Sequence, residues 1–125
     1  MYLGDKQLGL LEKVIDASVI RHKVIANNIA NVNTPGYKRL DTSFETELKA
    51  ALKGSGSSDI SSIKPKVVVA KNTEKTSQRN DGNNVNIEEE VSELVKNALS
   101  YNVFVQLMSK KFAMLKSAIG GGTPS

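Results

Sequence analysis

The sequence of 125 residues contains no cysteine, no tryptophan and a single histidine. The lack of cysteine excludes disulfide bonds and thiolate metal sites. With His22 as the only imidazole, zinc sites and nucleophile–base pairs lack the residues that they require. The sequence therefore predicts no catalytic residue, no metal site and no cofactor. We expect a protein that is not an enzyme and has no small-molecule substrate.

Large aromatic side chains and long apolar runs are also scarce. No purely apolar run is longer than residues 67–70, which is far too short to cross a membrane. The N-terminus has no basic segment followed by an apolar run, so no secretory signal peptide is predicted. Three Phe and three Tyr are few groups to fill a globular core. We expect that the chain does not fold as a compact unit along its whole length.

Charge of one sign is not concentrated anywhere in the sequence. Seventeen basic and 13 acidic residues give a net charge of +4, and they are spread along the chain. A pI of about 9.3 raises the alternative of a nucleic-acid-binding protein. Because no dense basic stripe accompanies it, we expect no nucleic-acid partner.

Apolar residues are plentiful at the two ends of the chain, where they recur at alternating spacings of three and four. This heptad pattern predicts one long coiled-coil helix over residues 1–33 and another over residues 86–119, with a short tail at 120–125. Asn86 is suited to cap the second helix, and residues 88–90 place three glutamates at its positive end. The predicted helix-seam interface consists of Leu8, Leu11, Ile15, His22, Ile25, Ile29, Val91, Leu94, Ala98, Tyr101, Val105, Met108, Phe112 and Leu115.

The middle of the chain, residues 34–85, reads as a turn followed by a polar insert. Thr42 and Glu45 have the spacing of a capping box, which predicts a short helix over about residues 42–53. Residues 54–62 have the Gly/Ser composition of a flexible linker, and residues 65–71 form a β-like run.

Residues 26–39, ANNIANVNTPGYKR, combine a helix end, a tight turn and an extended exit. Proline disfavours helical geometry at the residue before it, so the helix should end near Asn33, where asparagine tolerates a left-handed conformation. Residues 34–37 then predict a type II turn with Gly36 at positive φ. Asparagine is a poor helix former, and the pair Asn28 and Asn31 lies on one side of the helix. We interpret these amides as side chains that meet neighbouring chains.

The apolar seams of both helices are wide, and the polar insert has too few apolar groups to cover them. The two helices could pair as an antiparallel hairpin, but a wide seam left exposed usually indicates further helices from other chains. The predicted fold is therefore mainly α, with two long terminal helices that pack as a coiled-coil bundle in an assembly and a small irregular or β insert between them.

Residues 26–38 resemble the N-terminal signature of the flagellar basal-body rod protein family. The resemblance extends over about residues 5–40 and 80–119, and the short chain with residues 81–90, 97–101 and 111–116 resembles the proximal-rod branch. Val32 departs mildly from the family, which often has Ala or Ser there. Carried over from the family, the assembly motif is Asn27, Asn28, Ala30, Asn31, Asn33, Thr34, Pro35, Gly36 and Tyr37.

The resemblance implies a structural subunit of the bacterial flagellar basal-body rod. Implied partners are other copies of itself, other rod proteins, the rod-base adaptor, the inner-membrane ring and the flagellar type III export apparatus. The implied location is the basal body, in the periplasm or cell-wall space, reached without a cleaved signal peptide.

Two alternatives remain open from the sequence alone. One is another proximal-rod subunit of the same family. The other is a non-flagellar, homo-oligomeric coiled-coil adaptor, which would explain the heptads but not the Asn-Thr-Pro-Gly-Tyr segment.

Overall fold

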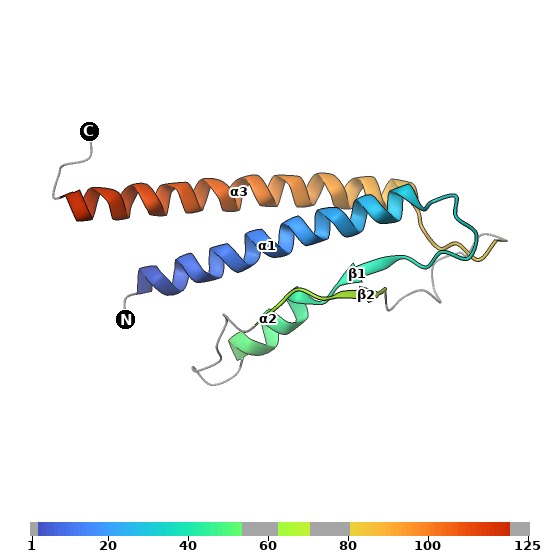
Figure 1. Cartoon of the computed structure of the whole chain (residues 1–125), viewed down its shortest axis with the longest axis horizontal. Coiled ribbons are helices and arrows are strands. Elements are labelled where there is room, and N and C mark those ends of the chain that lie inside the picture. Colours follow the sequence, from blue (N-terminus) through green and yellow to red (C-terminus); the bar gives the residue numbers. More distant parts are fainter. Residues whose placement is uncertain (1–2, 54–62, 71–80, 121–125) are drawn as a thin grey trace.

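A computed structural model describes residues 3–53, 63–70 and 81–120 of the chain. The elements are α1 (Leu3–Ala30), β1 (Leu40–Thr42), α2 (Phe44–Lys53), β2 (Val67–Val69) and α3 (Ile87–Gly120). Figure 1 shows α1 beside α3, with the β1–α2–β2 segment along the other side of α1. The predicted mainly α fold, with a small β insert between two long helices, is confirmed. The predicted linker at 54–62 and most of the tail lie outside the described residues.

The two long helices run antiparallel. Asn28 of α1 donates to Glu90 near the start of α3, whereas Gln7 accepts a hydrogen bond from Lys111 far along it. The two chain termini therefore lie at one end of the molecule, which we call the open end (Figure 1). The other end, where α1 leads into the insert and the insert returns to α3, is the closed end.

A polar pair lies between the helices midway along them. The amide of Asn97 donates to the backbone carbonyl of Ser18 at 2.8 Å, and both residues are buried. The Ser18 hydroxyl in turn donates to the carbonyl of Val14 at 3.0 Å. Because a buried amide loses its partner if the helices slide, this pair favours one alignment of α1 against α3.

The insert is a short antiparallel hairpin interrupted by α2. Leu40 pairs with Val69 and Thr42 with Val67, and β1 is the strand nearer to α1. The α2 helix begins at Phe44, two residues after the predicted start. Ser43 precedes it and donates from its hydroxyl to Glu47 at 2.9 Å.

The predicted capping box at the start of α2 is wrong. Thr42 lies in β1 and its hydroxyl accepts a hydrogen bond from Arg21, while the Glu45 carboxylate forms an ion pair with Arg21 at 2.6 Å. Both side chains therefore face α1 instead of capping α2. The three-residue spacing of Thr42 and Glu45 is that of a capping box, but here it lets both side chains contact Arg21.

The end of α1 differs in detail from the prediction. The helix stops at Ala30, and a tightened turn follows in which the Thr34 amide donates to the carbonyl of Asn31 at 3.0 Å. Gly36 has φ of +74° and the Tyr37 amide donates to the carbonyl of Thr34, which confirms the predicted turn. No asparagine among the described residues has positive φ, so the expected left-handed Asn33 is wrong. The carbonyls of Asn31, Val32 and Thr34 in this turn accept hydrogen bonds from a distant part of the chain.

The start of α3 agrees with the prediction. The Asn86 side-chain oxygen accepts from the amides of Glu88 at 3.0 Å and Glu89 at 3.3 Å, so Asn86 caps the helix as expected. Glu88 and Glu89 are exposed beside it, where their charge suits the helix dipole.

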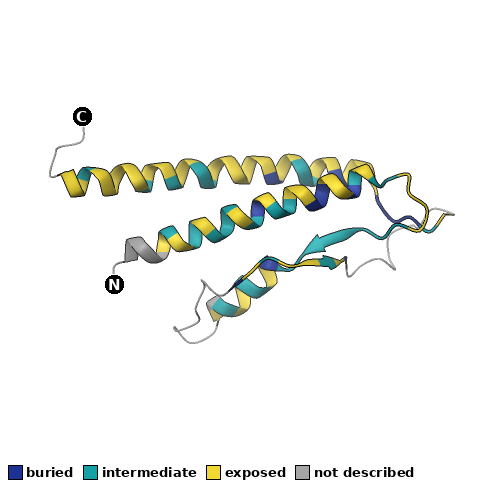
Figure 2. Ribbon diagram, viewed as in Figure 1, coloured by how far each residue is buried: buried dark blue, intermediate teal, exposed yellow. Residues whose placement is uncertain are grey.

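Buried residues concentrate toward the closed end. Figure 2 shows them along one half of α1 and at the loops that join the insert to α3, whereas α3 is mostly exposed. No described residue of α3 beyond Asn97 is buried. The single chain therefore has a small, partly polar core at the closed end and little shielding elsewhere. The buried residues are Ser18, Val24, Ile25, Asn28, Phe44, Ile63, Ala70, Asn83, Asn84, Val85, Glu90 and Asn97.

Candidate functional site

The asparagine-rich segment forms the first half of a polar cluster at the closed end. We call this cluster the clasp and define it by Asn28, Tyr37, Arg39, Asn83 and Glu90. It joins the end of α1, the exit into β1 and the segment that leads into α3.

Asn28 lies at the centre of the clasp and is fully buried within its own chain. Its amide nitrogen donates to the carbonyl of Leu40 at 2.9 Å, and its side-chain oxygen accepts from the amide of Leu40 at 2.9 Å. The side chain thus pairs with β1 as a neighbouring strand would. The Tyr37 hydroxyl donates to the same oxygen at 2.9 Å. Our interpretation of Asn28 as a side chain that meets a neighbouring chain is therefore wrong.

Glu90 links the clasp to α3. Its side chain is 1 % exposed, accepts from the Arg39 Nε and from the Asn28 amide at 3.3 Å, and forms an ion pair with Arg39. Burial lowers the pKa of the Arg39 guanidinium, but the hydrogen bond and the charge of Glu90 outweigh burial and raise it above its ordinary value. Glu90 is thus a buried carboxylate with a paired cation, in contrast to its exposed neighbours.

Asn83 binds the turn that follows α1. Its buried amide nitrogen lies 2.8 Å from the carbonyl oxygen of Asn31, 3.1 Å from that of Val32 and 2.8 Å from that of Thr34. These carbonyls belong to the turn after α1, so a residue about 50 positions later holds that turn in place. The neighbouring Asn84 accepts from the amide of Arg39 at 2.7 Å.

The exposed members of the motif form a second ring of hydrogen bonds around the clasp. Asn27 donates to the Tyr37 hydroxyl at 3.0 Å, Asn31 donates to the carbonyl of Asn27 at 2.8 Å, and Thr34 donates to the Asn31 side chain at 3.0 Å. Burial raises the pKa of the Tyr37 phenol above its ordinary value. The bond from Asn27 opposes this rise and the charge of Glu90 adds to it. Ala30, Asn33, Thr34, Pro35 and Gly36 are exposed.

Two glycines bring the two halves of the clasp together. Gly36 and Gly82 both have positive φ, of +74° and +79°. A side chain on Gly82 would begin 3.6 Å from the Cα atom of Gly36, and the Gly36 amide donates to the carbonyl of Asp81 at 2.8 Å. Lys38 completes the contact by donating from its ammonium group to the carbonyl of Gly82.

The predicted helix seam is only partly covered by the single chain. On α1, Ile25 is buried and His22 is exposed; on α3, the residues that face α1 include Glu90, Asn97 and Phe104. With 3.6 residues per turn, this contact face lies about a fifth of a turn from the centre of the predicted seam. The half-buried seam residues are Leu8, Leu11, Ile15, Ile29, Leu94, Val105 and Met108, and the exposed ones on α3 are Val91, Ala98, Tyr101, Phe112 and Leu115.

An apolar groove runs between α1 and α3 next to the Ser18–Asn97 pair. Val19 and His22 line it on α1, and Ala98 and Tyr101 line it on α3. His22 is thus at the edge of a groove that continues the exposed seam of α3.

The described residues offer no constellation for chemistry. Among them, no three His, Asp or Glu side chains come close enough to hold a metal ion. None of the described helices is long and apolar enough to cross a membrane. The ionisable groups of the clasp already have partners. Arg39 pairs with Glu90, and the Tyr37 hydroxyl bonds to Asn27 and Asn28.

Sequence reasoning found one half of the clasp and missed the other. It singled out Asn28 and Tyr37 but treated Glu90 as helix-dipole compensation, and it did not connect Asn83 with the end of α1. Arg39 ended the signature segment without a role. The only signal for the second half is a run of asparagines at 83, 84 and 86 just before the helix, which is unusual for a linker.

The comparison with protein families places the motif in a known group. Residues 17–38 match the family model described as flagella basal body rod protein. This match spans the second half of α1 and the turn that enters the clasp.

Similarity to individual proteins extends over nearly the whole chain. The FlgB flagellar basal body rod proteins of Bacillus subtilis strain 168 and Aquifex aeolicus strain VF5 are 34% and 36% identical, over 90% and 91% of this chain and 92% and 93% of their own. That of Escherichia coli K12 is 24% identical over 94% of this chain and 96% of its own. These relatives carry the FlgB name and not that of FlgC, the similar proximal-rod protein that the sequence left as the alternative. The chain belongs to the FlgB family of flagellar basal-body rod proteins.

Proposed function

We propose that this structural subunit of the proximal flagellar rod assembles through the apolar faces that its long helices leave uncovered. The observation that carries the proposal is the exposure of Val91, Ala98, Tyr101 and Phe112 along one side of α3. Apolar residues in a heptad pattern gain most from burial against further helices. Neighbouring copies of the chain and other rod proteins are the partners that fit such a face.

The clasp has a supporting role in this proposal. By tying α1, β1 and α3 together, it holds the two helices at one angle and presents their apolar faces in a fixed relation. The outer ring of the motif, with Asn33 and Pro35 exposed beside it, is the part of the motif available to a neighbouring subunit.

The finer placement in the cell is part of the proposal. We propose that the chain passes through the flagellar type III export apparatus without a cleaved signal and assembles in the periplasm or cell-wall space. The rod-base adaptor and the inner-membrane ring are then its neighbours at the foot of the rod. Helices with little buried apolar surface near the chain ends suit this route because they order fully only when neighbours cover them.

A deletion strain with complementation tests the proposal. Cells that lack the gene should show basal bodies without a rod in electron micrographs, and the wild-type gene should restore it. Ala98→Glu places a charge in the exposed seam and should fail to restore the rod although the chain is produced. Ser92→Glu, an exposed position on another side of α3, should restore it. Normal rods with Ala98→Glu would show that this face of α3 is not an assembly surface.

A further inference from the structure

The β hairpin has one open edge, on the outermost strand of the molecule. Figure 1 shows β1 next to α1, and β2 beyond β1 on the side away from the long helices. Among the described residues, the sheet consists of these two strands alone. The outer edge of β2 is therefore the place where a third strand would add.

The hydrogen bonds around the hairpin fix the direction of its main-chain groups. The Ala70 amide donates to Arg39 and the Ser43 amide donates to Lys66, so these residues face across the ladder. In an antiparallel pair the direction alternates, and Leu40 accordingly points its amide and carbonyl away from β2, toward Asn28. The Asn28 side chain thus closes the outer edge of β1.

The same alternation applies to β2. Val69 is paired with Leu40 and Val67 with Thr42, so the amides and carbonyls of both valines point away from β1. The opposite edge of the hairpin has its amide partner in Asn28, but no interaction of this kind reaches Val67 or Val69 from the described part of the chain. Two donors and two acceptors are left in line for an extended chain.

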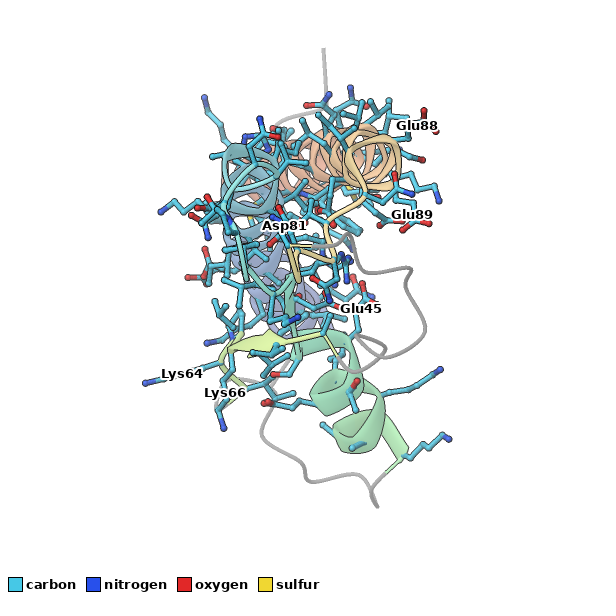
Figure 3. The ribbon with its side chains drawn as sticks, turned by 90° about the vertical axis from the view of Figure 1, so that its right-hand side faces the viewer. Glu45, Lys64, Lys66, Asp81, Glu88 and Glu89 are labelled. Carbon is cyan, nitrogen blue, oxygen red and sulfur yellow. The ribbon has the colours of Figure 1, made fainter. Side chains whose placement is uncertain are left out.

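The side chains along this edge indicate which charge a bound strand should carry. Val67 and Val69 are 51 % and 56 % exposed, and they offer β-branched surface on one face of the strand. Lys64 and Lys66 are exposed just before them. Figure 3 shows both lysines projecting together beside β2, on the side of the molecule opposite to Glu45. Within residues 3–53, 63–70 and 81–120, no carboxylate forms an ion pair with either lysine.

We propose that the outer edge of β2 binds an extended, acidic segment of another protein by strand addition. The main-chain groups of Val67 and Val69 would supply the hydrogen bonds, as in other complexes where a peptide extends a sheet. Carboxylates on the added strand would meet Lys64 and Lys66, and β-branched residues would cover the two valines. This surface is separate from the helical faces proposed for rod assembly (Figure 1).

A labelled peptide tests this directly with the full chain. The probe is a fluorescent ten-residue peptide of alternating Glu and Val between Gly-Ser ends, and the control peptide has Lys in place of Glu. Fluorescence anisotropy should show saturable binding of the acidic peptide that weakens as salt is raised. The basic peptide should bind at least about tenfold more weakly, because it meets like charges.

Two variants separate the main-chain and charge contributions. Val67→Pro removes one outward amide without touching the bonds to β1, and it should weaken binding about tenfold, as expected for lost main-chain hydrogen bonds. The double change Lys64→Glu and Lys66→Glu should weaken it by a similar factor. Circular dichroism should be unchanged in both variants, whereas Val68→Pro, whose amide faces β1, should disturb the hairpin itself.

Three results would overturn the proposal. These are no binding of the acidic peptide, equal binding of the two peptides, and binding unaffected by Val67→Pro. Loss of binding that coincides with self-association of the chain through this edge would also contradict it, since the occupant would then be a second copy. None of these outcomes depends on whether α3 assembles into a rod.

Discussion

At the residue scale, the Asn28 side chain makes four hydrogen bonds at the closed end. It completes the edge of β1 through Leu40 and also bonds to Tyr37 and Glu90. Only a side chain with a donor and an acceptor at fixed separation can pair with both groups of one backbone residue. Its position in a helix, against its low helix propensity, is explained by these contacts.

Replacing this residue should open the clasp. Asn28→Leu leaves the half-buried amide and carbonyl of Leu40 without their partner, and we expect a loss of about 3 kcal/mol in the free energy of unfolding. Urea denaturation followed by circular dichroism measures this loss. The exposed Asn102→Leu should change stability by less than about 0.5 kcal/mol. Equal stability of the two variants would show that the clasp does not hold the closed end together.

Glycine is required at position 36 because of the backbone conformation there, and not because a side chain would lack space. A Cβ atom there would meet nothing within 4 Å, but φ is +74°. Gly36→Val should therefore cost about 1–2 kcal/mol and reduce motility, whereas Gly36→Asn should be nearly neutral because asparagine tolerates this conformation. Swimming of complemented cells and urea denaturation measure the two effects. Similar defects in both variants would show that the positive φ is not the reason why glycine is needed here.

Tyr37 makes the clasp sensitive to high pH. Its folded-state pKa is raised, so the protonated phenol is favoured in the folded chain. Its contribution to stability is full below the unfolded value of about 10 and is lost as the pH rises through the folded value. The stability difference between wild type and Tyr37→Phe should shrink above about pH 10. A difference that stays constant up to about pH 11 would contradict this.

At the scale of elements, the two long helices are unequal along their length. Burial is found between Ser18 and Asn28 on α1 and between Glu90 and Asn97 on α3, and the other residues of 7–30 and 87–120 are exposed or half-buried. An isolated helix gains most of its stability from packing, so the open end should fray in the isolated chain. The closed end should remain ordered through the clasp.

Hydrogen exchange of the isolated chain measures this gradient. Backbone amides around residues 24–30 and 90–97 should exchange slowly, and those of residues 3–12 and 105–118 should exchange quickly. The helix signal in circular dichroism should accordingly fall well below that of helices of 28, 10 and 34 residues. Uniform protection along α1 and α3 would show that the chain folds fully without neighbours.

The helices could be predicted from the sequence because their signals are local. Heptad spacing, the cap at Asn86 and the turn before Gly36 each depend on residues close together in the chain, and each agrees with the structure. The clasp could not, because it pairs Asn28 with Glu90 and the turn with Asn83. The first turn of a helix favours glutamate in any case, so nothing local distinguishes a buried Glu90 from Glu88.

At the scale of the whole molecule, the chain exposes many large apolar side chains along α3. Along α3 alone, Leu99, Phe112 and Met114 are each more than half exposed, and Ile119 is 86 % exposed. Patches of this kind mark interaction surfaces in soluble proteins. They agree with a subunit whose core is completed by its neighbours in the rod.

Phe112 provides a test at this scale. If Phe112 is buried between subunits, Phe112→Ala should cost the assembly about 3–5 kcal/mol for each buried ring, while the isolated chain should hardly change. Sedimentation of assembled rod material and denaturation of the monomer separate the two effects. Gln106→Ala, at another exposed position of α3, serves as the control. Assembly that is unaffected by loss of the ring would place Phe112 outside the core.

The clasp joins residues that are far apart in the sequence, and this separation determines the order in which the closed end can fold. If the chain emerges from a narrow conduit with its first residue leading, α1 and the turn after it are released long before Asn83, which binds that turn, and Glu90, which anchors Arg39. Until those residues follow, the turn lacks its bonds to the Asn83 amide and Asn28 lacks its bond to Glu90. A truncated chain that stops before residue 83 therefore cannot form the clasp. Only a subunit that contains both halves of the sequence folds at its closed end.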